Sequence, residues 1–347
     1  MIEGSLSAPA GCSLACFTLG DLDVVTAGND ELQLAFLPQA GGRLISLRLN
    51  GDEVLWRNPA YVSDDLRPVV ACGAWSRPDG TMASWVNVGG NKTWPAPQGW
   101  SGAHEWPGPP DEILDGGSYA VEATVDEGGA AHVTLTSASD PRTGLRISRA
   151  FTLPASGSTF SQVSTFVNDS SAPVRWSVWE VTQVDTTPRQ DFTDPGTFRV
   201  DVTRPDPPLC LLRVVGTAHS RSAPDYVEVP VQETVGKMGF PNATGRVTWL
   251  RGDGLRLEQT TVREAAAPYP DEGCAVELWL QYPLPEPLVT LGGLHPDAHV
   301  VEMKCCRHLW RYRREGGPAS RCSGGLTVCG EGLANVSTGS RTRVLSR

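Results

Sequence analysis

The chain has 347 residues, which is enough for one large all-β domain or two average domains and for a substantial buried core. Its 40% hydrophobic and 20% charged residues are typical of an ordinary globular protein in water. The formal net charge of -10 argues against nucleic acid and anionic membrane surfaces, because both attract basic faces. A small-molecule ligand is the partner that this balance favours, and the sequence indicates no oligomeric state.

The N-terminus shows no export signal. It reads "MIEGSLSAPAGCSLACFTLG", without a basic region followed by an uninterrupted apolar core. Nowhere do about eighteen apolar residues follow one another, so no membrane-spanning helix is predicted. The nine Cys are an odd number without such a signal, which favours reduced thiols over a disulfide framework. We therefore expect a cytoplasmic protein.

Hydrophobic residues alternate with a period of two along most of the chain. The first runs are "LQLAFLP" and "RLISLRL", and Asn50-Gly51 separates the second from "EVLW". Asn-Gly between alternating runs predicts a tight β-hairpin, because both residues tolerate positive φ. From residue 118 the pattern repeats in "SYAVEATV", "AHVTLTS", "LRISRAFTL", "FSQVSTFV" and "VRWSVWEVTQV". Further strands are predicted at 197–203, 209–216, 246–251, 255–262, 274–282, 299–304 and 326–329.

This pattern predicts an all-β fold. No long stretch has a period of 3.6, and 28 Pro and 37 Gly would interrupt a helix. Many short strands at even spacing indicate a large, many-stranded antiparallel β-sandwich. No clean linker divides the chain, so we expect a single domain over 1–347, with loops at 184–195 and 204–208.

The segment 64–117 breaks the alternation and contains five of the eleven Trp. A long irregular stretch inside a compact domain is usually functional or disordered, and large aromatics argue against disorder. We expect an ordered insertion that lines a cleft.

Within this insertion, residues 87–100 read "NVGGNKTWPAPQGW", a mixture that neither a core helix nor an ordinary strand requires. Trp94 and Trp100 offer flat apolar faces, beside the polar groups of Asn91, Lys92 and Gln98. Such a set suits a sugar, which has C–H-rich faces and a hydroxyl-rich rim. The alternative is that the Trp side chains fill a small core under a long loop while Lys92 extends to water.

The same stretch, followed by "EWPGPPDEILDGGSY" at 105–119, resembles an uncharacterised branch of the galactose-mutarotase-like superfamily. Members of that branch carry a GG-x-K-x-W-P-A-P-Q-x-x-W segment. Three further stretches resemble the superfamily in the expected order: "GGRLISLRLNGDEVLW" (41–56), "NDSSAPVRWSVWEVTQV" (168–184) and "YPDEGCAVELWLQYPLPEP" (269–287). Together they cover most of residues 30–310, and the fold that they imply is the large mutarotase-like β-sandwich.

The resemblance also implies catalytic residues. A mutarotase needs a carboxylate that takes the proton of the anomeric hydroxyl and an acid that protonates the ring oxygen. Glu277 matches the family's base; the alternative is an outward-facing strand carboxylate. The two His of the family are missing, since Trp179 and Glu180 stand at one position and Asn87-Val88 at the other. Glu180, Lys92 and His104 are the candidate replacements.

Several other residues are candidates for ligand contacts. Arg43 follows Gly41-Gly42, and Arg77 lies with Asp79 in "WSRPDG". Arginine binds carboxylate or phosphate through its planar fork, although each of these residues is equally well explained as a solvated loop charge. The remaining candidates are Trp179 and Gln281, which lie on predicted strands, and Lys237 in "VGKMGF", a possible cleft cation.

No metal or cofactor is predicted. His295, His299, Cys305, Cys306 and His308 lie close together, but their spacing matches no paired zinc motif. The chain also contains no P-loop, no dinucleotide-binding glycine fingerprint and no G-x-S-x-G elbow.

The sequence thus predicts a carbohydrate-active protein that binds a mono- or oligosaccharide in a Trp-lined cleft. Its reaction would be an epimerase- or mutarotase-type isomerisation with a Glu base, and Lys92, Trp94 and Glu277 should converge on one cavity. Two alternatives stay open. One is a non-catalytic sugar-binding protein, and the other is recruitment of the fold for acid–base cyclisation or isomerisation of a non-sugar metabolite.

Overall fold

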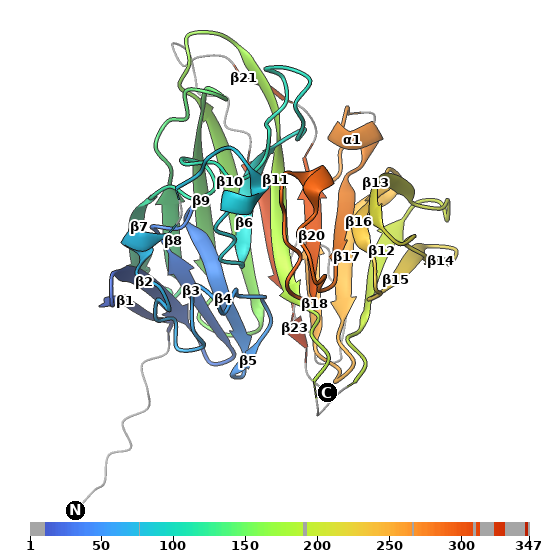
Figure 1. Cartoon of the computed structure of the whole chain (residues 1–347). Helices are drawn as coiled ribbons and strands as arrows, with labels where there is room; N and C mark the ends of the chain where they lie inside the picture. Colours follow the sequence, from blue (N-terminus) through green and yellow to red (C-terminus); the bar gives the residue numbers. More distant parts are fainter. Residues whose placement is uncertain are drawn as a thin grey trace, which may run out of the picture.

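Two large antiparallel sheets pack face to face in the computed structural model (Figure 1). The structure describes residues 11–75, 77–189, 193–265 and 267–307, and the backbone of strands 310–312, 323–329 and 344–345. Every strand pair in this part of the chain is antiparallel, and the helical elements there are one short α-helix and three 3-10 turns. The predicted all-β sandwich is confirmed.

The first sheet has twelve strands. Ten of them form the order β1-β2-β3-β4-β6-β11-β20-β19-β16-β13, while β5 pairs with β4 and β21 with β11. The strands are β1 (Ser13–Leu19), β2 (Leu22–Gly28), β3 (Leu32–Leu37), β4 (Arg43–Leu49), β5 (Asp52–Glu53), β6 (Asn91–Ala96), β11 (Val174–Asp185), β13 (Leu209–Val215), β16 (Val235–Phe240), β19 (Val276–Gln281), β20 (Val300–Cys306) and β21 (Trp310–Tyr312).

The second sheet has eleven strands in the order β14-β15-β12-β17-β18-β22-β10-β9-β8-β7, with β23 paired to β18. The strands are β7 (Ala120–Val125), β8 (Ala131–Thr136), β9 (Leu145–Leu153), β10 (Thr159–Asn168), β12 (Thr197–Val202), β14 (Arg221–Ser222), β15 (Tyr226–Pro230), β17 (Ala243–Leu250), β18 (Arg256–Thr260), β22 (Ser323–Cys329) and β23 (Val344–Leu345).

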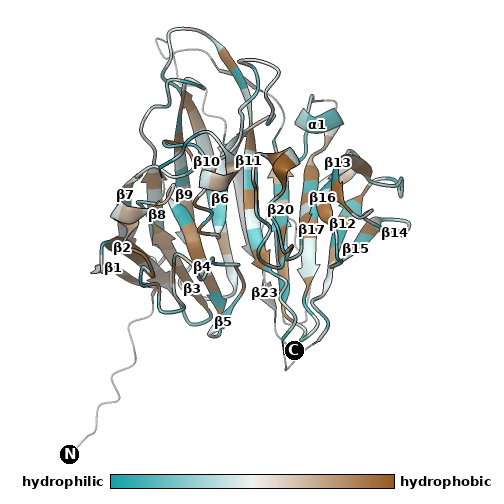
Figure 2. Ribbon diagram, viewed as in Figure 1, coloured by the Kyte–Doolittle hydropathy of each residue, from teal (hydrophilic) through white to brown (hydrophobic). Residues whose placement is uncertain are grey.

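The main core lies between the two sheets. Buried and half-buried residues alternate strictly along β8, β9 and β10, because successive strand residues point to opposite faces. The inward set includes Phe36, Phe151, Leu257 and Leu278, which belong to one cluster with members from both sheets. Figure 2 shows the hydrophobic residues concentrated in the strands.

Most predicted strands are present within a few residues of their expected bounds. Asn50 and Gly51 form the predicted turn, with φ of 52° and 96°, between β4 and the short β5. The strands predicted at 197–203, 209–216 and 274–282 are β12, β13 and β19. Alternation identified them correctly because each lies in a sheet whose inner face is buried.

The segment 64–117 differs from the prediction at its centre. Residues 91–96, "NKTWPA", form β6, a fully buried strand in the middle of the first sheet. Pro is disfavoured in central strands because it cannot donate a hydrogen bond. Here Pro95 is tolerated because β6 pairs with β4 only through Leu44 and Asn91, and beyond that point its regular partner is β11.

The helical elements are short. They are 3-10 turns at Cys72–Ala74, Met82–Ser84 and Val289–Leu291, and the helix α1 at Pro270–Gly273. Three successive residues of α1 have positive φ: Asp271 at 49°, Glu272 at 60° and Gly273 at 89°. In the described part of the chain no helix is long and apolar enough to cross a lipid bilayer.

Candidate functional site

Strands β6 and β11 carry two different polar sets on their two faces. Lys92 and Trp94 of β6 point away from the second sheet, as does Trp179 of β11, while Asn91 and Thr93 hydrogen-bond toward it. Alternation along a strand therefore separates residues that are neighbours in sequence.

The outward face holds a group of charged residues that we call the charged row: Lys92, Glu302, Lys304, Lys237, Glu277 and Asp271. At one end the Lys92 Nζ lies 4.2 Å from the ring centre of Trp94 and 4.8 Å from that of Trp85. It is also 3.4 Å from Glu302 Oε1. Glu302 in turn contacts Lys304, with 2.9 Å between Oε2 and Nζ.

The middle of the charged row lies over one indole. The Nζ atoms of Lys304 and Lys237 each lie 4.4 Å from the ring centre of Trp179, an arrangement that favours a cation over an aromatic face. The Trp179 and Trp94 ring centres are 6.2 Å apart, so the two ends of the row share an aromatic floor.

Glu277 lies at the other end of the row and is fully buried. Its Oε2 is 2.8 Å from the Nζ of Lys237, which also forms an ion pair with Asp271. Glu277 is paired across the strands with Lys304, and Cys306 Sγ lies 3.8 Å from its Oε1. The carboxylate of Glu277 is therefore surrounded by two cations, Lys237 and Lys304, and one further acid, Asp271.

Burial gives two members of the row a pKa close to neutral. It raises the pKa of Glu277 from 4.5 to about 7, with Asp271 adding to the rise and Lys237 opposing it. It lowers the pKa of Lys92 from 10.5 to about 7, against the attraction of Glu302. Two buried groups that titrate near neutrality form the basic requirement for acid–base chemistry.

The neighbouring ion pairs hold Glu302, Asp271 and Lys237 charged. Burial alone would raise the pKa of Glu302, but Lys304 and Lys92 lower it to about 2. Burial would likewise raise the pKa of Asp271, but Lys237, the hydrogen bond with Glu277 and the charge of Lys304 together outweigh burial and hold the pKa below its usual value. For Lys237 the two carboxylates outweigh burial, so its pKa is raised and the ammonium stays protonated.

The charged row is covered rather than open. Trp94 and Trp179 belong to a second apolar cluster together with Trp106 and Leu114 from the insertion and Tyr269 from the chain before α1. The loops after β6 and the helix α1 lie at the same end of the sandwich (Figure 1). Lys92, Trp94 and Glu277 thus share one face, but packed side chains fill the space that the sequence predicted as a cleft.

Glu180 and Asn91 lie on the opposite face and do not join the charged row. Glu180 Oε2 accepts hydrogen bonds from Thr93 and Gln162, both at 2.8 Å, between the sheets. Asn91 and Thr93 accept from the buried guanidinium of Arg149. Burial raises the pKa of Glu180, yet its carboxylate cannot reach a ligand on the outward face, because the β11 backbone lies between. The predicted acid role of Glu180 is therefore dropped.

A pocket of about 330 Å³ lies inside the insertion, and we call it the insertion pocket. Trp75, Trp85, Arg77 and Arg43 line it, so both predicted arginines face the same hollow. Arg43 is buried and bonded to Asp115, whose carboxylate also accepts the indole N–H groups of Trp85 (2.7 Å) and Trp94 (3.0 Å). Trp85 separates this pocket from Lys92.

The remaining predicted site residues belong neither to the charged row nor to the insertion pocket. The exposed fraction of Trp100 is 75%, whereas that of Trp94 is 2%, so these two residues do not form one platform. Gln98 donates to the Pro107 carbonyl, and the polar contacts of the exposed His104 in the described residues are with its loop neighbours Ser101 and Glu105. Gln281 shares the outward face of β19 but bonds to the Ala298 carbonyl.

Known structures share the overall fold of this chain. A Salmonella typhimurium protein described as a "putative mutarotase (YeaD)" has a TM-score of 0.58 and 14% identity, over 90% of this chain and 92% of the other. A galactose mutarotase-like protein from Clostridium acetobutylicum has a TM-score of 0.53 and 10% identity, over 91% and 97%. The fold is that of the galactose-mutarotase-like proteins. At these identities the likeness establishes the fold alone.

The sequence comparisons agree with an uncharacterised branch of that fold. Residues 22–194 match the family model of DUF4380, a domain of unknown function, and this match includes β6 and the insertion. No curated protein matches the chain in sequence. The resemblance predicted from the sequence is thus confirmed for the fold.

In this mutarotase-like sandwich the sequence analysis missed four charged residues: Glu302, Lys304, Asp271 and Asp115. A signal existed for two of them. "VVEMKCC" places Glu302 and Lys304 two residues apart in an otherwise apolar strand, which puts both on one face. Their partners could not be found, because Lys92 and Glu302 are 210 residues apart in the chain.

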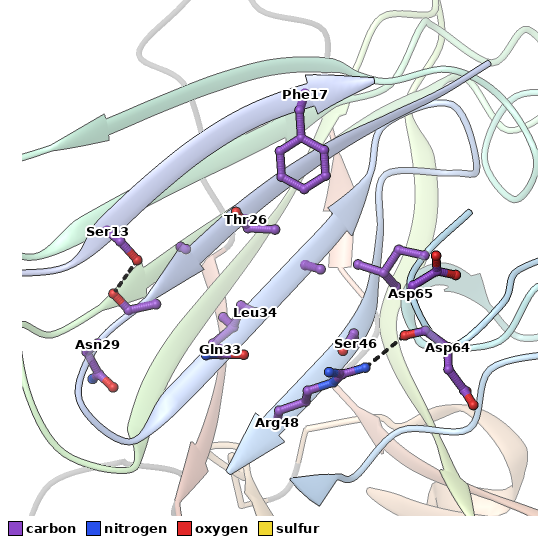
Figure 3. Close-up of a pocket in the computed structure, with 14 residues that line it drawn as sticks. Ser13, Phe17, Thr26, Asn29, Gln33, Leu34, Ser46, Arg48, Asp64 and Asp65 are labelled. Carbon is purple, nitrogen blue, oxygen red and sulfur yellow. Dashed lines mark hydrogen bonds between the residues drawn. The ribbon is translucent and has the colours of Figure 1, made fainter. Parts of the chain in front are cut away.

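The largest pocket volume among those described, about 380 Å³, belongs to a groove over β1–β4 (Figure 3). Phe17, Arg48 and Asp64 are among its lining residues, and Arg48 donates to the Asp64 carbonyl at 2.9 Å. None of the predicted site residues lies there, so we do not place the site in this groove.

No group of three potential metal ligands occurs among the residues that the structure describes. Cys305 and Cys306 point to opposite faces, the first into the main core and the second toward Glu277. His308 lies outside the described residues.

Proposed function

We propose that this protein binds a sugar on the outward face of its first sheet and that Glu277 transfers the proton in a mutarotase-type isomerisation. The observation that carries the proposal is the environment of Glu277. This carboxylate is fully buried beside Lys237 and Lys304, which both lie over Trp179, and its pKa is raised to about 7. A base with this pKa accepts a proton readily at neutral pH and releases it again.

The proposed reaction needs a second group for the ring oxygen. We assign this role to Lys304, which is the cross-strand partner of Glu277 and lies over Trp179. Glu277 takes the proton of the anomeric hydroxyl while Lys304 donates one to the ring oxygen, and the ring opens. When the ring closes on the other face of the carbonyl, Glu277 returns its proton to the anomeric oxygen and Lys304 regains one from the attacking hydroxyl. The reaction is therefore balanced without a cofactor.

Two buried polar atoms support a ligand on this face. The indole N–H of Trp179 and the Oε1 of Gln183 have no hydrogen-bond partner among the described residues. Gln183 belongs to the same face because its Nε2 donates to Glu302 at 3.0 Å. A buried donor or acceptor without a partner is costly, and a hydroxyl can satisfy both kinds.

The side chains that cover the charged row must move before a sugar can reach Glu277. The turn over Glu277 holds Asp271 and Glu272 at positive φ, a conformation that costs non-glycine residues on the order of 1 kcal/mol or more each. Because the closed turn is strained, displacement by a ligand that replaces Asp271 on Lys237 is inexpensive. We therefore place the entry of the sugar at this turn.

The test is anomer-exchange NMR on a panel of aldoses, with saturation-transfer NMR to detect binding. Wild-type protein is expected to accelerate interconversion of one or more sugars. Glu277→Gln should lose about 100-fold or more of that acceleration and still bind the sugar. Glu122→Gln, on the exposed strand β7, is the matched control. Equal exchange rates in wild type and Glu277→Gln would rule out the proposed base.

A non-catalytic sugar-binding function is the second candidate, and the open insertion pocket favours it. This pocket of about 330 Å³ presents Trp75, Trp85 and Arg77 but no residue of the charged row. In that case saturation transfer would detect a sugar and Trp75→Ala would weaken its binding, while anomer exchange stayed at the uncatalysed rate. Binding of apolar ligands but of no sugar would instead favour chemistry on a non-sugar metabolite.

A further inference from the structure

A third pocket lies at the far edge of the first sheet, over the last strand β13 and its neighbour β16. Its volume is about 270 Å³, and we call it the edge pocket. Pro208, Leu212 and Met238 contribute apolar walls, and Leu212 is a large hydrophobic residue that is 39% exposed. The two strands are out of regular register at two points, between Cys210 and Leu212 and again after Arg213, where the sheet edge is irregular.

The edge pocket is basic in an acidic protein. Arg213 and Lys237 line it, and none of its lining residues is Asp or Glu, whereas the whole chain carries a formal net charge of -10. Arg213 is exposed and contacts only the Thr217 hydroxyl, at 3.5 Å, with no carboxylate partner among the described residues. Asp271 and Glu277 pair with Lys237, so Arg213 is the cation available to a ligand.

We propose that the edge pocket binds a small amphipathic acid. The carboxylate would pair with the guanidinium of Arg213, whose planar fork suits that group, and a short apolar tail would lie against Pro208 and Met238. The volume lies just below the range of about 300–1,000 Å³ that is usual for small-molecule sites, so the ligand must be short. Lys237 borders both this pocket and the charged row, but the proposed carboxylate binds Arg213, and neither the Trp-rich insertion nor the acid–base chemistry of Glu277 takes part.

The chain contains its own reporter for occupancy. Cys210 is an exposed free thiol that lines the edge pocket, and Cys16 is an exposed free thiol on β1, at the opposite end of the same sheet. A ligand in the edge pocket should slow alkylation of Cys210 and leave that of Cys16 unchanged. Cys16 is therefore an internal control in every sample.

The experiment measures alkylation of each thiol by iodoacetamide with peptide mass spectrometry, at increasing concentrations of butanoate, hexanoate or octanoate. Protection of Cys210 should saturate, and each further buried methylene should strengthen binding about fourfold. Octanol, which has the same tail without the charge, should bind about fivefold more weakly than octanoate.

Two variants test the role of the cation. Arg213→Gln should weaken octanoate binding about fivefold, and Arg213→Lys should retain most of it. Because Arg213 is exposed, both variants should keep the wild-type thermal transition, which circular dichroism would verify. Equal protection of Cys210 and Cys16, no protection at all, or unchanged binding by Arg213→Gln would overturn the proposal. None of these results depends on whether a sugar is isomerised.

Discussion

The burial of Glu277 has a direct consequence for the stability of the protein. Its pKa is 4.5 in the unfolded chain and about 7 in the folded one, so folding favours the protonated form. Below pH 4.5 both states are protonated and folding carries no penalty. Between pH 4.5 and 7 the unfolded state is ionised while the folded state keeps its proton, so stability falls as the pH rises.

The full penalty above pH 7 is on the order of 3 kcal/mol, since one pKa unit corresponds to about 1.36 kcal/mol. At pH 5 less than about 1 kcal/mol of it has developed. Glu277→Gln cannot ionise and escapes the penalty at every pH. Relative to wild type, the variant should therefore gain about 2–3 kcal/mol in free energy of unfolding between pH 5 and pH 8.

Urea denaturation at both pH values measures this difference. Glu122→Gln is the matched control, because it makes the same substitution on the exposed strand β7, away from every buried charge. Its effect on the free energy of unfolding should be nearly the same at pH 5 and pH 8. If the unfolding free energies of Glu277→Gln and wild type change in parallel over this interval, the burial argument for Glu277 is refuted.

Two further substitutions test other parts of the site. Trp94→Ala should cost about 3–5 kcal/mol in thermal or urea unfolding because its indole is buried, whereas the exposed Trp100 should tolerate alanine within about 0.5 kcal/mol. Similar costs for the two would contradict their different burial. Arg149→Met should destabilise by about 3–5 kcal/mol because it leaves Glu180 buried without its cation, and Arg149→Met/Glu180→Gln should recover part of that loss. A double variant no better than Arg149→Met would show that the two charges are not coupled.

The fold could be predicted from the sequence because it depends on a local signal. A sandwich strand buries one face, so hydrophobic alternation marks β8, β9 and β10 without any knowledge of their partners. The resemblance then placed Glu277 and Lys92 in one site, and both lie on the same face. Strand β6 was missed because its Pro, Gly and Trp content outweighed the short run of strand residues.

The arrangement of the site could not be predicted because it depends on pairing between distant strands. Glu277 meets Lys304 through the register of β19 and β20, and Lys92 meets Glu302 only because both β6 and β20 flank β11. The sequence analysis also assigned both Trp179 and Glu180 to one cleft. Adjacent residues of a strand point to opposite faces, so only one of them could face the ligand.

Strand β6 presents the ammonium group of Lys92 on one face of its sheet and the amide of Asn91 on the other. The backbone conformation at Gly89 and Gly90 determines which of these two residues points to which face. A Cβ at either glycine would lie 2.4 Å from a backbone carbonyl oxygen, and their φ values are 99° and 79°. Deleting or inserting one residue here would exchange the environments of Asn91 and Lys92, and two separate polar systems would fail together. Length changes should therefore be far less tolerated in this stretch than in the loop around Trp100, and a library of single-codon deletions would map that boundary directly.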